Sequence, residues 1–312
     1  MNRPPPAILL LGPTASGKTA AAMRLFDALP VDLISVDSAQ VFIDLNIGTA
    51  KPEAEVLARA PHRLIDLITP EERYSAARFR ADALAAMAES TAAGRVPVLV
   101  GGTMLYFRAL LHGLAELPQA DATLRARIDA DAASRGWPAM HAQLAALDPL
   151  TAARLHATDS QRIQRALEVC LTSGQPMSAL LAASAAEKPP YDFLQLALLP
   201  SDRAALHERI AQRFDAMLRA GLLEEVRHLR SKYRLQPDLP SMRCVGYRQA
   251  WEVLTGSLPA KELRERGIYA TRQLAKRQIT WLGNSFTAEP LDCLDPALDK
   301  AVLERAQKFL SS

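Results

Sequence analysis

The sequence contains few cysteines and carries little net charge. Its 312 residues include only three cysteines, Cys170, Cys244 and Cys293. An odd number of cysteines, far apart and without the spacing of metal ligands, argues against a disulfide framework or a zinc site and favours a reducing compartment. The formal net charge is only +3, so any nucleic-acid-binding surface must be local.

Long hydrophobic runs are also lacking. The first apolar run, residues 7–11, is too short for a membrane span or for the core of a signal peptide. The segment before it carries one arginine and three prolines. We therefore expect a cytoplasmic protein that does not associate with a membrane.

Short apolar runs alternate with helical patterns along the first hundred residues. The runs cover 7–11, 32–36 and 96–100, and the helical patterns cover 18–29 and 75–93. Runs that are buried on both faces and separated by helices are typical of βαβ units. The sequence therefore predicts an α/β fold of the P-loop type, with a parallel sheet flanked by helices.

The pattern changes between residues 117 and 190. Strand-like runs disappear there, and helical pieces rich in alanine and arginine take their place. A buried-strand pattern returns at 193–199 and is followed by amphipathic helical patterns at 202–230 and 263–282. We predict a discontinuous catalytic core, 1–116 and 191–312, with an all-helical insertion at 117–190.

A phosphate-binding loop follows the first apolar run. It matches G-x-x-x-x-G-K-[ST] and consists of Gly12, Pro13, Thr14, Ala15, Ser16, Gly17, Lys18 and Thr19. Backbone amides and the start of a helix favour phosphate oxygens, Lys18 adds a positive charge, and the Thr19 hydroxyl is placed to bind Mg²⁺. The loop recognises phosphoryl groups without specifying what they are attached to.

The third apolar run departs from the usual pattern of ATP and GTP hydrolases. In those enzymes a hydrophobic strand ends in an acidic ligand of Mg²⁺. Here the strand ends in Gly101, Gly102 and Thr103, with no carboxylate. This weakens the interpretation of the chain as a hydrolase or a motor.

Asp37 lies at the carboxyl end of the second predicted strand. Ligands of open α/β sheets bind at that edge, so a carboxylate there could accept a proton from an attacking nucleophile. Two other interpretations remain open. Asp37 could cap the following turn, or it could bind the metal of the phosphate loop.

Several segments together resemble the bacterial tRNA dimethylallyltransferases, and they span nearly the whole chain in the order found in that family. The matching stretches are GPTASGKT at 12–19, ISVDSAQVF at 34–42, IGTAKP at 47–52, PHRLID at 61–66, YSAARFR at 74–80, VGGTMLYFRALL at 100–111, QRIQRALEV at 161–169, RCVGYRQ at 243–249 and ATRQLAKRQITWL at 270–282.

This resemblance implies a reaction and its catalytic residues. The N6 amine of adenosine 37 in tRNA attacks the allylic carbon of dimethylallyl pyrophosphate, and pyrophosphate leaves with Mg²⁺. Asp37 corresponds to the general base and Thr103 to a residue near the reacting amine. Arg213 corresponds to an arginine that contacts pyrophosphate, although Arg209 lies one helical turn away on the same face.

The resemblance also implies contacts with the anticodon stem-loop, where the target base must be flipped out of its stack. The residues concerned are Asp37, Ser38, Ala39, Gln40 and Thr103 near the base, Arg125, Gln161, Arg162, Ile163, Gln164 and Arg165 in the insertion, and Arg243, Cys244, Val245, Gly246, Tyr247, Arg248, Lys276 and Arg277 towards the C-terminus. We expect the enzyme to act as a monomer.

Charge is concentrated near the C-terminus. Residues 241–283 contain eight basic and three acidic side chains, a local net charge of +5. An ordinary exposed helix would explain part of this pattern, but the concentration favours a surface that contacts phosphates.

Two other functions are compatible with parts of the sequence. A small-molecule or nucleoside kinase also combines a phosphate loop with an acidic residue after the second strand. A non-catalytic RNA-binding protein could use the loop to sense a nucleotide. Isoprenyl transfer to tRNA separates the transferase from both.

Overall fold

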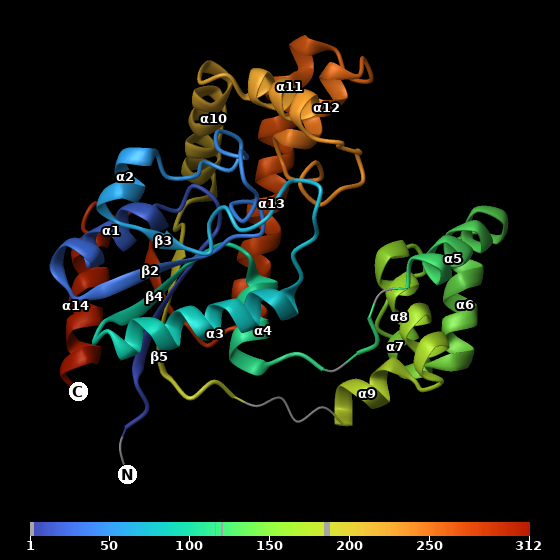
Figure 1. The fold of residues 1–312 in the computed structure, drawn as a ribbon, viewed down its shortest axis with the longest axis horizontal. Coiled ribbons are helices and arrows are strands. Elements are labelled where there is room, and N and C mark those ends of the chain that lie inside the picture. The colour runs from blue at the N-terminus through green and yellow to red at the C-terminus, as the bar shows by residue number, and fades with distance from the viewer. Residues whose placement is uncertain (1–2, 116, 120, 184–187) are drawn as a thin grey trace. The chain divides into compact units, whose positions relative to one another are not determined.

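A computed structural model describes residues 3–115, 117–119, 121–183 and 188–312. The chain folds as two compact units (Figure 1). The core unit comprises Met1–Leu111 and Pro189–Ser312, and the helical unit comprises His112–Lys188. The helical unit therefore begins a few residues before the predicted insertion at 117–190.

One parallel sheet organises the core unit, in the order β3-β2-β4-β1-β5-β6. Its described strands are β1 (Pro6–Leu11), β2 (Val31–Val36), β3 (His62–Arg63), β4 (Val96–Gly101), β5 (Asp192–Leu199) and β6 (Glu289–Asp292). The predicted α/β class is confirmed. The edge strands β3 and β6 were not predicted, because they are short and mostly polar.

Helices cover both faces of the sheet, which explains why its inner strands are apolar throughout. Ala7, Leu9 and Leu11 of β1 pack towards α3 (Ala76–Ala92) and α4 (Met104–His112). Ile8 and Leu10 pack on the opposite face, towards α1 (Lys18–Ala28) and α14 (Leu298–Ser311). All five side chains are fully buried. The sheet thus provides a rigid base for the loops at its carboxyl edge.

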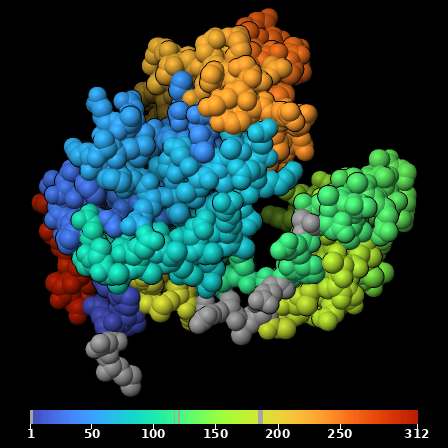
Figure 2. Space-filling view, viewed as in Figure 1, coloured from blue at the N-terminus to red at the C-terminus, as the bar shows by residue number. Residues whose placement is uncertain are grey.

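The C-terminal helices of the core unit form a second block with its own hydrophobic cluster. In the space-filling view α11 and α12, coloured gold to orange, gather beside the blue and cyan half of the core unit (Figure 2). The elements of this region are α10 (Arg203–Arg219), α11 (Leu222–Lys232), α12 (Tyr247–Leu254), η1 (Ala260–Glu262) and α13 (Leu263–Ser285), and the remaining helix of the core unit is α2 (Ala54–Arg59).

Helix α13 connects this block to the sheet. Leu263, Ile268 and Ala275 belong to the cluster of the C-terminal helices, whereas Leu282 packs in the core beneath α3 and α4. Gly267 permits close packing, since a Cβ atom there would lie 1.9 Å from the ring of Phe214 on α10. The end of α13 is thereby brought to the carboxyl edge of the sheet.

The helical unit has a small core of its own. Its helices are α5 (Ala122–Arg135), α6 (Trp137–Leu147), α7 (Pro149–Ala152), α8 (Ser160–Ser173) and α9 (Met177–Ala183). Asp148 is fully buried and connects α7 to α9. One of its oxygens accepts from the Thr151 amide and the Ser178 hydroxyl, and the other accepts from the Thr151 hydroxyl and the Ser178 amide.

Asp148→Asn is expected to destabilise the helical unit by about 2 kcal/mol at neutral pH. Burial acts to raise the pKa of Asp148, but the hydrogen bonds from Thr151 and Ser178 outweigh it and leave this pKa at about 2. Each carboxylate oxygen faces a backbone amide, so an Asn side chain must place its NH₂ group against one of them. Hydrogen exchange of α7 and α9 measures the loss.

The pH dependence of this prediction follows from the lowered pKa. The stabilisation is complete above about pH 4 and disappears as pH falls towards 2, so the variant and the parent should converge in acid. Asp159→Asn is the matched control, because Asn replaces Asp well as the N-cap of α8. Equal exchange in Asp148→Asn and the parent at pH 7 would contradict the prediction.

Candidate active site

Three loops meet at the carboxyl edge of the sheet. The phosphate loop follows β1, Asp37 follows β2, and Gly102 and Thr103 follow β4. Because β4 lies between β2 and β1, these segments are neighbours. Ligands of open α/β sheets bind at this position, which is where the sequence predicted a site.

The phosphate loop closes around the ammonium group of Lys18. Gly17 has φ 80°, a left-handed conformation that favours glycine and starts α1. The Lys18 Nζ donates to the carbonyl oxygens of Gly12 (2.9 Å) and Pro13 (2.6 Å). Burial and the charge of Arg213 lower the pKa of Lys18 to about 7, although Asp37 acts in the opposite direction. The loop thus holds a cation that gains from a bound anion.

The Asp37 carboxylate stabilises the turn that follows it with one oxygen and leaves the other oxygen free to accept a proton. Its Oδ1 accepts from the amides of Ala39 (2.8 Å) and Gln40 (3.3 Å). The turn-capping role left open by the sequence is therefore present. The other oxygen accepts no hydrogen bond from the described residues, so the same carboxylate can also receive a proton.

Thr103 joins the loop after β4 to the loop after β2. Its amide donates to Val36 O (3.2 Å), and its hydroxyl oxygen accepts from the Ser38 amide (3.0 Å). The same hydroxyl donates to Ser38 Oγ at 3.3 Å. Thr103 is therefore held next to Ser38, the residue that follows Asp37.

The two arginines of α10 differ in their surroundings. Arg209 donates to the carbonyl oxygen of Cys293 (2.9 Å). Arg213 is half-buried and forms no ion pair with a carboxylate among the described residues. Burial lowers the pKa of Arg213, while the charge of Asp37 raises it. Arg213 thus interacts electrostatically with both Asp37 and Lys18.

Metal binding at this edge would depend on few protein ligands. The described residues contain no cluster of three or more histidine, cysteine or acidic side chains that could hold an ion. Thr19 is exposed at the first turn of α1. A lone hydroxyl beside a phosphate loop fits Mg²⁺, which is commonly bound through substrate phosphates and water.

Comparison with known proteins identifies the family. A family model described as IPP transferase matches residues 40–285. The chain belongs to the IPP transferase family. It is 72% identical to a tRNA dimethylallyltransferase of Dechloromonas aromatica over 100% of both chains, and 61% identical to one of Thiobacillus denitrificans over 95% of this chain and 94% of the relative.

Solved structures support the same assignment. A tRNA isopentenylpyrophosphate transferase of Bacillus halodurans superposes with a TM-score of 0.71 at 33% identity. The match covers 98% of this chain and 96% of the other. The P-loop fold predicted for this IPP transferase is therefore confirmed.

The C-terminal motif of this IPP transferase is only partly accessible. Arg243 and Arg248 are exposed, Cys244 and Val245 are half-buried, and Gly246 is buried. Tyr247 is fully buried, and its hydroxyl donates to Glu225 (2.5 Å). We therefore correct the predicted role of the Tyr247 side chain from tRNA contact to packing. On a helix where polar and apolar residues are intermixed, the spacing of residues alone does not show whether an aromatic side chain points to the core or to the surface.

Glu225 is a structural residue that the sequence did not reveal. Its carboxylate also accepts from the amides of Asn46 (3.1 Å), Ile47 (2.7 Å) and Gly48 (3.3 Å). It therefore anchors to α11 the loop that follows residues 37–40, which we call the Asp37 strip. Gln40 supports that loop from the other side, through hydrogen bonds with Ser35 (3.0 Å) and the Thr49 carbonyl (3.4 Å).

Two predicted tRNA contacts in the helical unit pair with one buried carboxylate. Arg125 and Arg165 both bind Glu168, which is fully buried, at 3.0 Å and 2.7 Å. Two guanidinium groups on one carboxylate leave an excess positive charge. Both arginines are about one-third exposed, so this excess lies at the surface.

The other predicted contacts of α8 differ in exposure. Arg162 is 73% exposed and pairs with Asp159, Gln161 is exposed, and Gln164 donates to Asp129 (2.6 Å). Ile163 is fully buried. The predicted contact through the Ile163 side chain is therefore corrected to a role in the core of the helical unit.

Helix α13 carries the remaining predicted contacts. Lys276 and Arg277 are exposed and pair with no carboxylate among the described residues. By contrast, Arg264 pairs with Asp215. The local excess of +5 is thus partly neutralised, and the end of α13 near the sheet retains unpaired cations.

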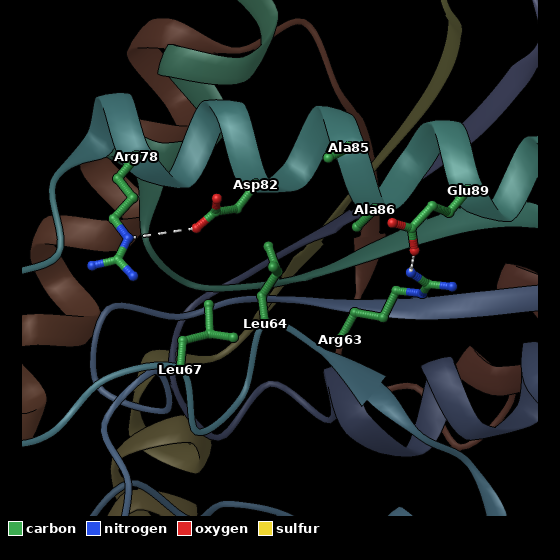
Figure 3. Close-up of a pocket in the computed structure, with 8 residues that line it drawn as sticks. All are labelled: Arg63, Leu64, Leu67, Arg78, Asp82, Ala85, Ala86 and Glu89. Atoms are coloured by element: carbon green, nitrogen blue, oxygen red, sulfur yellow. Dashed lines mark hydrogen bonds and ion pairs between the residues drawn. The ribbon is translucent and has the colours of Figure 1, made fainter.

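A groove of about 380 Å³ lies between α3 and the segment after β3 (Figure 3). Its charged side chains neutralise one another, since Arg63 binds Glu89 and Arg78 lies 3.8 Å from Asp82. None of the predicted catalytic or phosphate-binding residues lines it. The carboxyl edge of the sheet therefore remains the candidate active site.

Proposed function

We propose that this IPP transferase transfers the dimethylallyl group from dimethylallyl pyrophosphate to N6 of adenosine 37 in tRNA. The observation that carries the proposal is the convergence of the phosphate loop, Asp37, Thr103 and Arg213 at one edge of the sheet. The relatives named tRNA dimethylallyltransferase support it over the full length of the chain. The absence of a carboxylate at the end of β4 does not favour a kinase.

The chemistry follows from the charges at this edge. As the allylic carbon–oxygen bond breaks, negative charge develops on the departing pyrophosphate and positive charge on the allyl group. Lys18, Arg213 and the amides of the phosphate loop stabilise the pyrophosphate. The N6 nitrogen forms the new bond to carbon, and Asp37 accepts the proton that the nitrogen loses. Thr103 keeps the Asp37 strip in place through Ser38.

Mg²⁺ is the cofactor that we propose for this site. The Thr19 hydroxyl would hold it together with oxygens of the donor. When bound, the ion adds positive charge against the leaving pyrophosphate.

The proposed acceptor is the anticodon stem-loop of tRNA. Asp37, Ser38, Ala39, Gln40 and Thr103 surround the position of the target base, and the exposed cations of α13 and of the helical unit contact phosphates. We further propose that the protein is monomeric and cytoplasmic. No helix among the described residues is long and apolar enough to span a membrane.

Incubation with dimethylallyl pyrophosphate, Mg²⁺ and unmodified tRNA tests the proposal. Mass spectrometry of the tRNA nucleosides should show one dimethylallyl group added to adenosine, and pyrophosphate should be released. Consumption of ATP without any isoprenyl transfer would support the kinase instead.

The double variant Lys276→Ala/Arg277→Ala is expected to weaken tRNA binding and to reduce its salt dependence. The logarithm of the tRNA association constant falls as the logarithm of the salt concentration rises. Loss of two phosphate contacts should make this negative slope shallower by about 1.5. Affinity for dimethylallyl pyrophosphate should not change. Filter binding at several salt concentrations measures the slope.

The matched control for this prediction is Arg24→Ala/Lys308→Ala, which removes the same charge from exposed positions of α1 and α14. It should leave the slope close to that of the parent. An equal reduction in both double variants would show that net charge, and not the surface of α13, governs binding.

A further inference from the structure

The side chain of Gln278 forms a bridge between two loops of the candidate active site. Its Oε1 accepts from the amide of Thr14 in the phosphate loop (2.9 Å). Its Nε2 donates to the carbonyl oxygen of Gly102, in the turn after β4 (2.8 Å). Both functional atoms of one half-buried amide are thus used, one on each loop.

The two loops have little else to hold them together. Strands β1 and β4 are paired as far as Leu11 and Gly101. Beyond these residues, no backbone hydrogen bond joins the phosphate loop to Gly102 or Thr103 in the described part of the chain. The side-chain amide of Gln278 therefore links the phosphate loop to the turn after β4, beyond the point where the pairing of β1 with β4 ends.

The environment of Gly102 shows how closely this bridge is packed. A Cβ atom at this position would lie 2.4 Å from Nε2 of Gln278 and 3.3 Å from the carbonyl oxygen of Gly12. Any other residue at 102 must displace the Gln278 side chain. The glycine and the glutamine are thus matched to each other.

The bridge joins the donor side of the site to the acceptor side. Thr14 belongs to the loop that would hold pyrophosphate, whereas Gly102 precedes Thr103, which fixes Ser38 and the Asp37 strip. Lys276 and Arg277 immediately precede Gln278 on α13. One helix therefore carries both the exposed cations and the side chain that connects the two halves of the site.

We propose that Gln278 is a positioning residue, which sets the separation between the bound donor and the amine of the acceptor. The inference rests on the proposed transferase function. Displacement of reacting groups by about 1 Å can lower a rate about 100-fold without loss of substrate affinity. Gln278 contacts neither reacting atom and acts through the positions of Thr14 and Gly102.

Gln278→Ala tests the proposal. We expect kcat to fall about 10-fold to 100-fold at saturating substrates, while affinity for inorganic pyrophosphate and for tRNA changes by less than about threefold. Thr280→Ala is the matched control on the same helix, because Thr280 is exposed and, within the described parts of the chain, its hydroxyl bonds only to the carbonyl of Lys276 (2.9 Å). An unchanged kcat in Gln278→Ala, or an equal loss in Thr280→Ala, would overturn the proposal.

A double-mutant cycle tests whether Gly102 and Gln278 act through one contact. Gly102→Ala alone should also lower kcat, because the new methyl group displaces the Gln278 amide. In the Gln278→Ala background the same substitution no longer meets the Gln278 amide, and the contact that stays is the milder one with the Gly12 carbonyl oxygen at 3.3 Å, so its additional effect should be at least fivefold smaller than in the parent. If the two substitutions lowered kcat by independent factors that multiply in the double variant, the bridge would be contradicted.

Hydrogen exchange separates failure of this inference from failure of the proposed function. In Gln278→Ala the amide of Thr14 loses its acceptor, so peptides covering 12–19 should exchange faster than in Thr280→Ala, whatever reaction the protein catalyses. Equal exchange in the two variants would exclude the bridge. If exchange is faster in Gln278→Ala than in Thr280→Ala but the parent protein transfers no dimethylallyl group, the bridge is retained and the proposed reaction is rejected.

Discussion

Asp37→Asn is expected to lower the rate of dimethylallyl transfer about 1,000-fold while leaving tRNA affinity nearly unchanged. The expected size follows from the contribution of a general base to proton transfer, about 10² to 10⁴. The amide oxygen of Asn can still accept from the amides of Ala39 and Gln40, as Oδ1 of Asp37 does at 2.8 Å and 3.3 Å. The substitution therefore keeps the turn and removes the proton acceptor.

The comparison with Asp37→Ala separates the two roles of this residue. Alanine loses both the base and the turn cap, so it should weaken tRNA binding beyond the effect of asparagine. Single-turnover kinetics with bound tRNA measures the chemical step directly. A rate for Asp37→Asn within tenfold of the parent would remove Asp37 from proton transfer and leave it as a cap.

Lys18→Met is expected to lower kcat/KM for the donor about 100-fold to 1,000-fold. Removing one group that stabilises a developing anion typically costs this much. Lys18 lies in the phosphate loop, where the partners of its ammonium among the described residues are carbonyl and hydroxyl groups of Gly12, Pro13 and Ser16. Methionine keeps most of the volume and loses the charge. Steady-state kinetics with varied dimethylallyl pyrophosphate measures the loss.

The lowered pKa of Lys18 gives this prediction a second measurement. Below pH 7 the ammonium is already charged, but above pH 7 donor binding must add a proton, because the anion favours the charged form. Binding should take up close to one proton per site well above pH 7 and far less than one well below it. Calorimetry in buffers of different ionisation enthalpy reports this uptake.

Lys18→Arg is the control for the proton measurement, since arginine stays charged across this range. Proton uptake in Lys18→Arg comes from the pyrophosphate group of the donor. The additional uptake in the parent protein is then the contribution of Lys18. Equal proton uptake by the two proteins at pH 8 would show that Lys18 is charged before the donor binds.

Electrostatics at the sheet edge explains why these two substitutions have the largest expected effects. Arg213 lies close enough to Lys18 to disfavour the charged form of the lysine, and Asp37 is the anion that favours the charged form of both groups. A bound pyrophosphate would relieve the repulsion between the cations. The site is thus arranged for an anion on one side and for a proton acceptor on the other.

Local patterns allowed much of the core unit to be predicted. The phosphate loop is a run of eight consecutive residues between a strand and a helix, so its conformation depends mainly on its own backbone. The inner strands were evident because both faces are covered, which makes their apolar runs continuous. The edge strands β3 and β6 and the helix α2 escaped prediction because their short sequences lack such a signal, whereas α14 escaped it although its 14 residues are amphipathic.

Long-range contacts were beyond the reach of sequence patterns. The spacing of Arg209 and Arg213 placed both on one face of α10, and the structure distinguishes them, because Arg209 donates to the carbonyl of Cys293 whereas Arg213 is half-buried. Tyr247 and Ile163 belong to segments that resemble tRNA-binding motifs, yet both side chains are buried. Arg125 and Arg165 were predicted from their charge, and only the fold of the helical unit shows that Glu168 binds both.

The sequence by itself determined the phosphate loop, the α/β class and the family, because each depends on residues that are neighbours along the chain or on motifs in a fixed order. The tertiary structure decided which side chains converge. Thr14 and Gln278 are 264 residues apart, and they meet only because α13 packs with one end among the C-terminal helices and the other against the sheet. Such a contact depends on the packing of whole elements, which no local pattern of residues encodes.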